Sequence, residues 1–231
     1  LNLNLMKDKF EYFDIVPYEY IKKKTSLAIL CEGEWRKAKI KSNFNLVKKS
    51  FKKLVDVIKI ESEILSQKKN KTKYDCLLSK YDRSLTSSRI TKIFSRIESF
   101  LKKTIPLILE KQRSYKSVPF TENLSESEQF ELSKDFMIKL GFDFSRGRID
   151  KSSHPFCGGS SEDIRITTRY NDADSFSCFD ALMHETGHAI YEQGLPKKWL
   201  HQPLGASGGM SLHESQSLFI EMQIIKSLQV S

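Results

Sequence analysis

The stretch FSCFDALMHETGHAIYE, residues 176–192, decides the fold of this chain. Its apolar residues recur at helical spacing, and the helix-ending residues Gly194 and Pro196 follow it. Its centre reads His184-Glu185-Thr186-Gly187-His188, so two histidines stand one turn apart on the same helix face. Two imidazoles in this arrangement can bind one metal ion. We therefore predict a buried helix that carries a metal site.

The residue types of this motif also indicate what the metal would do. Neutral imidazole suits Zn²⁺ at about 2.0–2.1 Å. Glu185 cannot share the direction of the two histidines, but it can reach a water molecule at the metal and accept its proton. The alternative is a pair of buried histidines with protein partners and no metal. We favour the metal site, with Glu185 as the general base.

A catalytic zinc site needs a third protein ligand. The candidates downstream are His201, His213, Glu214 and Glu221. His201 stands too far from the motif for the short form in which a third histidine completes the site. Glu214 lies on the next predicted helix, and an antiparallel return would bring it beside the histidine pair. We expect Glu214 to be the ligand, and Glu221 to support the site from outside or to lie at the surface.

The rest of the chain reads mainly as helices. Apolar residues at steps of three and four predict helices over residues 35–65, 87–110, 125–140 and 211–228. Pro106 should kink the second of these or end its first part. Ser125 with Glu128 forms a capping box, and Gly141 stops that helix. Residues 163–170 alternate as a strand does, so the predicted fold is mainly α with one small antiparallel sheet.

Composition excludes several classes of protein. The 231 residues carry 15 Phe and 8 Tyr, enough for a core, so we do not expect a disordered chain. No apolar run is long enough to span a membrane, and the first ten residues do not resemble a signal peptide. Cys31, Cys76, Cys157 and Cys178 show no CxxC spacing, so we expect reduced thiols and a cytoplasmic protein.

The charge is uneven along the chain. The net charge is +9, yet residues 151–231 carry 6 basic and 9 acidic side chains, so the first part is strongly basic. Lysines outnumber arginines and are spread over predicted helix faces rather than clustered with aromatic residues. We interpret them as solvated faces and expect no nucleic-acid partner.

Several motifs together resemble the carboxypeptidase Taq family of metallocarboxypeptidases. These are helical, cytosolic, homodimeric enzymes that remove single residues from the C-termini of peptides. The resemblance covers nearly the whole chain and is carried, in the family's order, by four motifs: His154-Pro155-Phe156, Asp163-Ile-Arg165-Ile-Thr167-Thr168, His184-Glu185-x-x-His188 and His213-Glu214-Ser215-Gln216-Ser217. It implies a gluzincin-like zinc-peptidase fold.

The resemblance also implies roles for individual residues. It makes His184, His188 and Glu214 the ligands of one Zn²⁺, or another divalent ion such as Co²⁺, and Glu185 the general base. The substrate cleft would be lined by His154, Asp163, Arg165, Thr167 and His213. The strand at 163–170 would offer an edge to an extended peptide, and His154 and His213 would donate hydrogen bonds. The structural alternatives are that His154 fixes a turn and that Arg165 pairs with Asp163 or Glu162.

The chain departs from the family pattern in length. Members are about twice as long, and the family's later Ile-Arg-x-x-Ala-Asp and Gly-x-x-Gln-Asp-x-His-Trp segments have no counterpart here. Residues 218–221 and Cys157 also differ from the family's usual residues. We expect one partial domain over 1–231, with a helical part at 1–140 and a metal-site part at 141–231, lacking the C-terminal half.

Three interpretations of this shortened domain remain open. The chain is one half of a peptidase that works as a homodimer or with a complementing chain, or it is an impaired fragment that binds metal or a partner without turnover. The third is a lysine-rich helical interaction module. The shortening should leave apolar residues uncovered on the last helix, at Leu218, Phe219 and Ile225.

Overall fold

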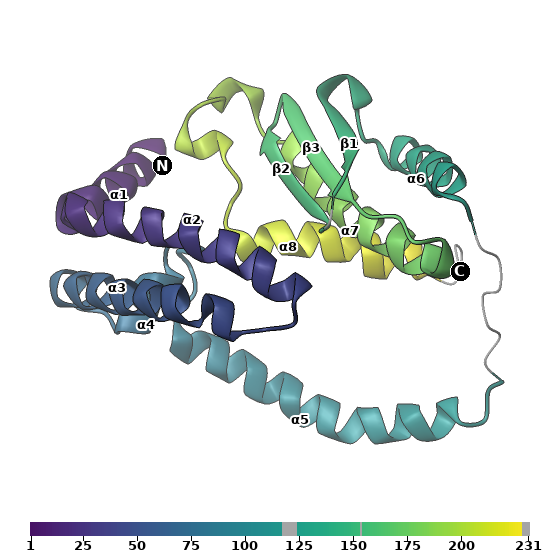
Figure 1. The fold of residues 1–231 in the computed structure, drawn as a ribbon, viewed down its shortest axis with the longest axis horizontal. Coiled ribbons are helices and arrows are strands. Elements are labelled where there is room, and N and C mark those ends of the chain that lie inside the picture. Colours follow the sequence, from purple (N-terminus) through teal and green to yellow (C-terminus); the bar gives the residue numbers. More distant parts are fainter. Residues whose placement is uncertain (117–123, 153, 228–231) are drawn as a thin grey trace. The chain divides into compact units, whose positions relative to one another are not determined.

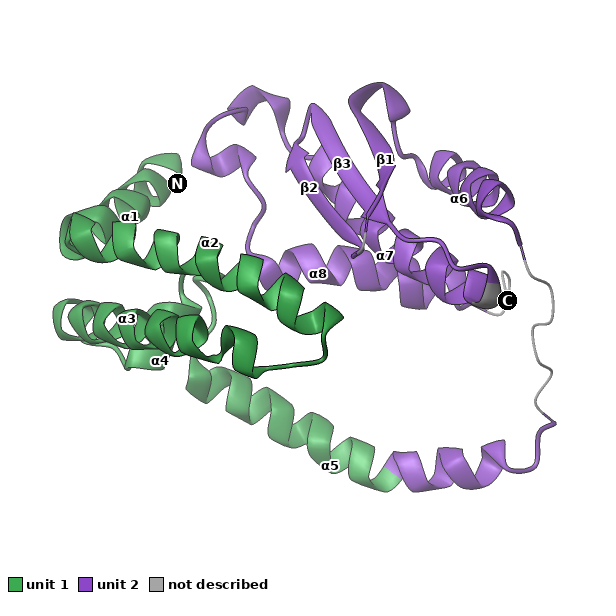
Figure 2. Ribbon diagram, in the orientation of Figure 1, with its two compact units in different colours: residues 1–103 green, residues 104–231 purple. Residues whose placement is uncertain are grey.

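A computed structural model describes residues 1–116, 124–152 and 154–227 (Figure 1). The chain forms two compact units, residues 1–103 and 104–231 (Figure 2). The boundary falls inside the long helix α5 (Ser87–Gln112). No helix in the described ranges is both long and apolar enough to cross a membrane.

Unit 1 is entirely helical in its described part. It consists of α1 (Asn2–Ile15), α2 (Tyr18–Ile40), α3 (Asn45–Lys69), α4 (Lys73–Leu78) and the first part of α5. Helices α2 and α3 lie side by side and bury Cys31, Ala38 and Val47 between them (Figure 1). A second small cluster joins α1, α3 and α4 through Val16, Leu65 and Cys76.

The prediction of one helix over residues 35–65 is wrong near its start. The chain leaves α2 after Ile40 and begins α3 at Asn45. Ser42 adopts a left-handed backbone with φ 46°, and the Asn43 side chain accepts a hydrogen bond from the Asn45 backbone N–H at 3.0 Å. Serine and asparagine compete with the helix for backbone hydrogen bonds in this way, so they open a turn within a helical apolar pattern.

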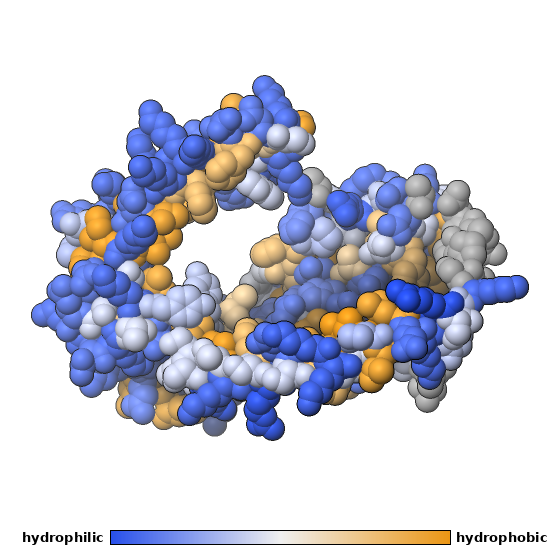
Figure 3. All heavy atoms as spheres, turned by 90° about the horizontal axis from the view of Figure 1, so that it is seen from below, coloured by the Kyte–Doolittle hydropathy of each residue, from blue (hydrophilic) through white to orange (hydrophobic). Residues whose placement is uncertain are grey.

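Helix α5 exposes its apolar stripe. It continues through Pro106, which therefore does not end it, and none of its residues is buried. Figure 3 shows orange hydrophobic side chains at the surface among blue hydrophilic ones. The exposed apolar residues of α5 are Ile93, Phe94, Ile97, Phe100, Leu101, Ile105, Leu107, Ile108 and Leu109. A stripe of this length is typical of a surface that another protein segment covers.

Unit 2 combines helices with the sheet. Its elements are the second part of α5, α6 (Glu126–Leu140), β1 (Gly147–Lys151), β2 (Phe156–Ser160), β3 (Asp163–Thr168), α7 (Ser175–Gln193), α8 (Met210–Leu218) and the π-helix η5 (Phe219–Ile225). Short 3-10 turns lie at Phe144–Arg146, Asp172–Asp174, Lys197–Trp199 and Pro203–Gly205. The capping box of Ser125 and Glu128 is present, and Gly141 ends α6 with φ 100°, as predicted.

The mainly helical fold with one small sheet is confirmed, but the sheet is mixed rather than antiparallel. Its strand order is β1-β3-β2. Strand β3 pairs antiparallel with β2 and parallel with β1. The chain reverses after β1 and again after β2, and β3 then enters between them, so β1 and β3 run in the same direction. Consequently β3 is the central strand and has neighbours on both sides.

The core of unit 2 lies around α7. Ile164 and Ile166 of β3 pack against Leu182, Met183 and Ala189 in one buried cluster. Helix α7 also contacts α6, α8 and η5, so the histidine motif is surrounded by packed elements (Figure 1).

The last predicted helix, over residues 211–228, is correct only in part. It is α-helical to Leu218 and then continues as the π-helix η5, and its predicted end at 228 lies outside the described residues. Leu218 and Phe219 are 43% and 54% exposed, as predicted, whereas Ile225 is 5% exposed. The prediction for Ile225 is wrong because this side chain belongs to the core around α7.

Candidate metal centre

Helix α7 presents His184 and His188 on one face. Asp174 caps the helix by accepting a hydrogen bond from the Ser177 backbone N–H at 3.3 Å. His188 follows His184 by four positions, and their rings meet edge to face with centroids 5.0 Å apart. The packing of Leu182, Met183 and Ala189 fixes the helix on the sheet, so the local sequence positions both imidazoles.

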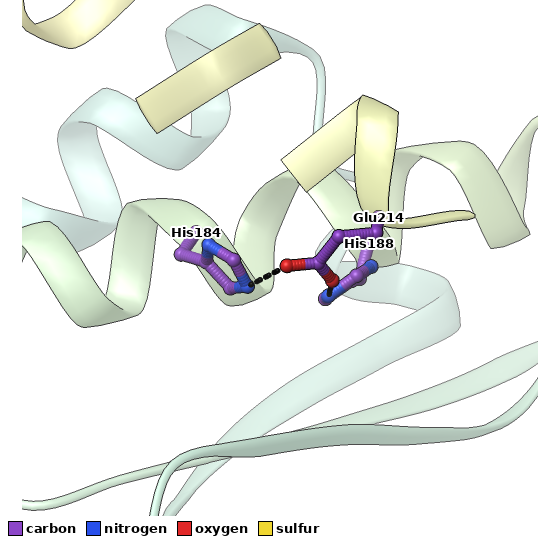
Figure 4. Close-up of side chains that lie close together, drawn as sticks. All are labelled: His184, His188 and Glu214. Atoms are coloured by element: carbon purple, nitrogen blue, oxygen red, sulfur yellow. Dashed lines mark ion pairs between the residues drawn. The ribbon is translucent and has the colours of Figure 1, made fainter. Parts of the chain in front are cut away.

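Glu214 of α8 approaches both histidines (Figure 4). One carboxylate oxygen lies 3.7 Å from His184 Nε2 and the other lies 3.2 Å from His188 Nε2. One ligand atom from each of the three residues lies within 4.8 Å of the others. Two ligands held about 2.1 Å from one ion at the tetrahedral angle would be about 3.4 Å apart. The three side chains therefore fit a small divalent cation.

Glu221 supports the site from outside this group. Its carboxylate lies 2.8 Å from His184 Nδ1, which leaves Nε2 of that ring to face Glu214. Burial raises the pKa of Glu221. The hydrogen bonds from Lys226 and His184 lower the pKa by more than burial raises it, so the pKa of Glu221 is below its usual value. A carboxylate in this place orients a ligating imidazole and raises its basicity. Of the two places predicted for Glu221, the structure shows the supporting one.

Two further residues, Asp180 and Lys226, support Glu221, and the sequence did not indicate them. Lys226 Nζ lies 2.8 Å from both Glu221 Oε1 and Asp180 Oδ2. Asp180 stands four residues before His184 on α7, and this spacing could have indicated that it lies on the same face. Lys226 fixes the two carboxylates beside His184.

Glu185 borders a small cleft next to the histidines. The cleft measures about 270 Å³ and is lined by Asp180, His184, Glu185 and Glu221, among others. Burial and the neighbouring Glu214 carboxylate raise the pKa of Glu185, although His184 partly opposes this. No ligand atom of Glu185 belongs to the group formed by His184, His188 and Glu214 among the described residues. A carboxylate with a raised pKa beside such a group is suited to accept and return a proton.

His188 and His213 form a stack. Their ring centroids are 4.4 Å apart, and His213 Nε2 lies 2.9 Å from Glu192 Oε1. Burial, together with His213 and His184, lowers the pKa of His188, which favours the neutral imidazole that a metal requires. Glu192 was not identified from the sequence, although it follows His188 by four residues. His213 lies close to the site, but Glu192 occupies one of its nitrogens.

Three of the other predicted substrate residues, Asp163, Arg165 and Thr167, lie on β3, and His154 lies in the segment before β2. Arg165 donates two hydrogen bonds of 2.6 Å to Asp163, which is one of the structural alternatives expected for it. Thr167 donates to the backbone carbonyl of His154 at 2.9 Å. Asp163, Arg165 and Thr167 alternate with the buried Ile164 and Ile166, so they face away from the core. In the part of the chain that the structure describes, none of these four residues belongs to the group formed by His184, His188 and Glu214.

The prediction that the strand at 163–170 offers a free edge is wrong. Both sides of β3 are paired, because β1 and β2 flank it. Strand β2 is an outer strand, and its Cys157 interacts electrostatically with carboxylates of the site. Burial, and then the carboxylates of Glu185 and Glu192, raise the pKa of Cys157 to about 12. All four cysteines are free, and Cys157 remains a thiol at neutral pH.

Gly187 permits the close approach of α7 and α8. A Cβ atom at this position would lie 2.6 Å from both the Gln216 carbonyl oxygen and Ser217 Cα. These contacts involve backbone atoms, which cannot rotate away. Gly187 therefore sets the distance between the histidines and Glu214.

We expect Gly187→Ala to destabilise the chain by about 1–3 kcal/mol because it forces α8 away from α7. Metal affinity should fall with it, since Glu214 moves with α8. Gly33→Ala is the matched control, because a Cβ there meets nothing within 4 Å. Gly33→Ala lies in helix α2, so it should leave metal binding unchanged and stabilise the folded chain by about 0.5–1 kcal/mol. Urea unfolding and metal titration measure both effects, and equal results for the two variants would contradict this interpretation.

Comparisons with known proteins identify a family. The family model of the carboxypeptidase Taq (M32) metallopeptidases matches residues 1–230. Carboxypeptidase 1 of Bacillus subtilis is 30% identical over 95% of this chain, and thermostable carboxypeptidase 1 of Pyrococcus furiosus is 31% identical over 91% of it. The structure of Trypanosoma cruzi metallocarboxypeptidase 1 superposes with a TM-score of 0.87 at 34% identity, over 98% of this chain.

The matches cover only part of these proteins. The chain spans 44% of the Bacillus protein, 42% of the Pyrococcus protein and 46% of the Trypanosoma chain. Less than half of each relative therefore has a counterpart here.

Proposed function

Because the chain belongs to the carboxypeptidase Taq (M32) metallopeptidase family, we propose that it provides the metal-binding half of a metallocarboxypeptidase that removes single residues from the C-termini of peptides. The observation that carries this proposal is the approach of Glu214 to Nε2 of both His184 and His188. In this proposal these residues hold one divalent ion per chain, Zn²⁺ or a related ion such as Co²⁺.

A divalent ion bound there would lower the pKa of a water molecule to about 7 and polarise the peptide carbonyl. Glu185 accepts the proton of the attacking water and returns it to the leaving amine. Its raised pKa supports both steps, since a carboxylate that is too acidic would not hold the proton. Glu221 holds the His184 ring in place through Nδ1.

The substrate would lie along β2 rather than β3. Strand β2 is at the outside of the sheet, and the charge of Glu185 raises the pKa of Cys157 within this strand. An extended peptide can add to such an edge through backbone hydrogen bonds. His213 stacks on His188 and is the nearest of the predicted substrate residues to the site. His154, Asp163, Arg165 and Thr167 would act at a distance from the bond that is cut.

Recognition of the substrate carboxylate would need a further group. Arginine is the usual partner of a carboxylate, but Arg165 is already paired with Asp163. We propose that this group comes from outside the chain, either from the C-terminal half of the family domain as a complementing chain or from a second copy of this chain in a homodimer. The exposed stripe of α5 and, separately, the exposed side chains of Leu218 and Phe219 offer apolar surface for that association. The four free cysteines support a cytoplasmic location for the assembly.

A cleavage assay tests the proposal directly. The chain is loaded with Zn²⁺ or Co²⁺ and incubated with an N-blocked dipeptide, alone and with the C-terminal half of the family domain as a separate chain. We expect release of the terminal residue in the second mixture and little in the first. Activity of the chain alone would show that the other half is dispensable. Metal binding without cleavage in either mixture would favour the impaired fragment over the enzyme.

A further inference from the structure

Unit 1 contains a pocket that the peptidase chemistry does not use. It measures about 480 Å³ and lies between α1, α2, α3, α4 and the segment after α4. This volume is within the range of small-molecule sites, about 300–1,000 Å³. All the lining residues belong to unit 1, so the pocket is formed within one compact body.

The lining is strongly cationic. Among its residues are six basic side chains and one carboxylate, that of Asp8. The six are Lys9, Lys24, Lys69, Lys71, Lys80 and Arg83. Like charges gathered in one concave surface raise the local concentration of anions.

Glu61 forms the base of this cluster. It is 2% exposed and accepts hydrogen bonds from Lys24 at 2.7 Å and from the Tyr12 hydroxyl at 3.0 Å. Lys80 also forms an ion pair with it, and its ammonium lies 4.4 Å from the centre of the Tyr12 ring. Two ammonium groups thus share one buried carboxylate, which leaves a positive charge at the base. Burial and the nearby Lys24 lower the pKa of Lys80 to about 8, as expected where cations crowd together.

The outer cations are only partly compensated. Arg83 binds Asp8 at 2.8 Å, and Lys69 lies 3.7 Å from Glu11. Lys9 and Lys71 have no ion pair within 4.0 Å among the residues that the structure describes. These two ammonium groups are the ones available to an incoming ligand without breaking an existing pair.

The pocket also has apolar walls. Tyr12, Phe13 and Leu65 line it beside the lysines. Aromatic side chains can stack on a flat ring, while lysines bind phosphate oxygens as point charges. We propose that this pocket binds a small phosphorylated molecule with a flat, apolar body, of the nucleoside monophosphate class. This binding is independent of the metal centre and of the proposed peptidase activity.

Calorimetric titration of the full chain with adenosine 5′-monophosphate tests this inference, with adenosine and inorganic pyrophosphate as companion ligands. At low salt we expect the monophosphate to bind at least about tenfold more tightly than adenosine, because adenosine lacks the charge. Pyrophosphate should compete with it. Absence of monophosphate binding, or equal binding of adenosine, would overturn the proposal.

Variants locate the site. The double variant Lys9→Gln, Lys71→Gln leaves the contacts of Glu61 intact and should weaken monophosphate binding at least about tenfold. Lys53→Gln is the matched control, since Lys53 is exposed on α3 and lies about 18 Å along the helix from Leu65. Circular dichroism verifies that both variants are folded. Equal affinity of the double variant and the unmodified chain, or an equal loss in the control, would show that the anion binds elsewhere.

Discussion

Replacing His188 with alanine should lower metal affinity by roughly 10²–10³-fold. Sites with four ligands bind Zn²⁺ with about 10–16 kcal/mol, so one ligand accounts for roughly 3–4 kcal/mol. The His188 side chain is only 12% exposed and faces Glu214 at 3.2 Å, and a water molecule would replace it poorly in that setting. His184→Ala and Glu214→Ala should cause losses of similar size. Competition with a chromophoric chelator measures each affinity.

Two comparisons sharpen this expectation. Glu221→Ala should cost only about 10–100-fold, because Glu221 orients His184 through Nδ1 and does not belong to the converging group. His154→Ala should change nothing, since this exposed histidine lies away from the group. A loss for Glu221→Ala as large as that for Glu214→Ala would mean that the third ligand has been assigned wrongly.

Local sequence patterns predicted the elements that carry the site. The period of residues 176–192 gave α7 to within one residue at each end, because apolar spacing and the helix-ending Gly194 act over a few residues. The capping box gave the start of α6 for the same reason. The spacing of His184 and His188, with Glu214 on a returning helix, was enough to anticipate which three side chains converge.

The features that the sequence did not predict depend on contacts between residues that are far apart in the chain. The order of the strands depends on where β3 enters the sheet, and no alternation pattern within 163–170 contains that information. The π-helix over Phe219–Ile225 and the burial of Ile225 depend on packing against α7. Glu192 and Lys226 were missed because their partners, His213 and Asp180, are far away in sequence. The pairing of Asp163 with Arg165 was anticipated as an alternative because it is local.

Glu185→Gln should retain the metal and lose about 10²–10⁴-fold or more in the rate of peptide cleavage. Glutamine has nearly the same shape as glutamate, so the packing of α7 is preserved, but an amide cannot accept a proton from water. The ligand group does not include Glu185, so one equivalent of metal should remain after dialysis. The rate is measured in whichever assembly cleaves the blocked dipeptide, and elemental analysis gives the metal content.

The metal-free chain offers a second readout of the same substitution. The pKa of Glu185 is raised above its usual 4.5 by burial and by Glu214, so the folded chain holds this proton more tightly than the unfolded chain does. The free energy of unfolding therefore decreases as pH rises from the unfolded pKa through the raised one. Glu185→Gln removes this decrease, so the variant should match the original chain at acidic pH and be the more stable of the two at neutral pH. Loss of metal in Glu185→Gln would place Glu185 among the ligands. An unchanged cleavage rate with metal retained would show that another group accepts the proton.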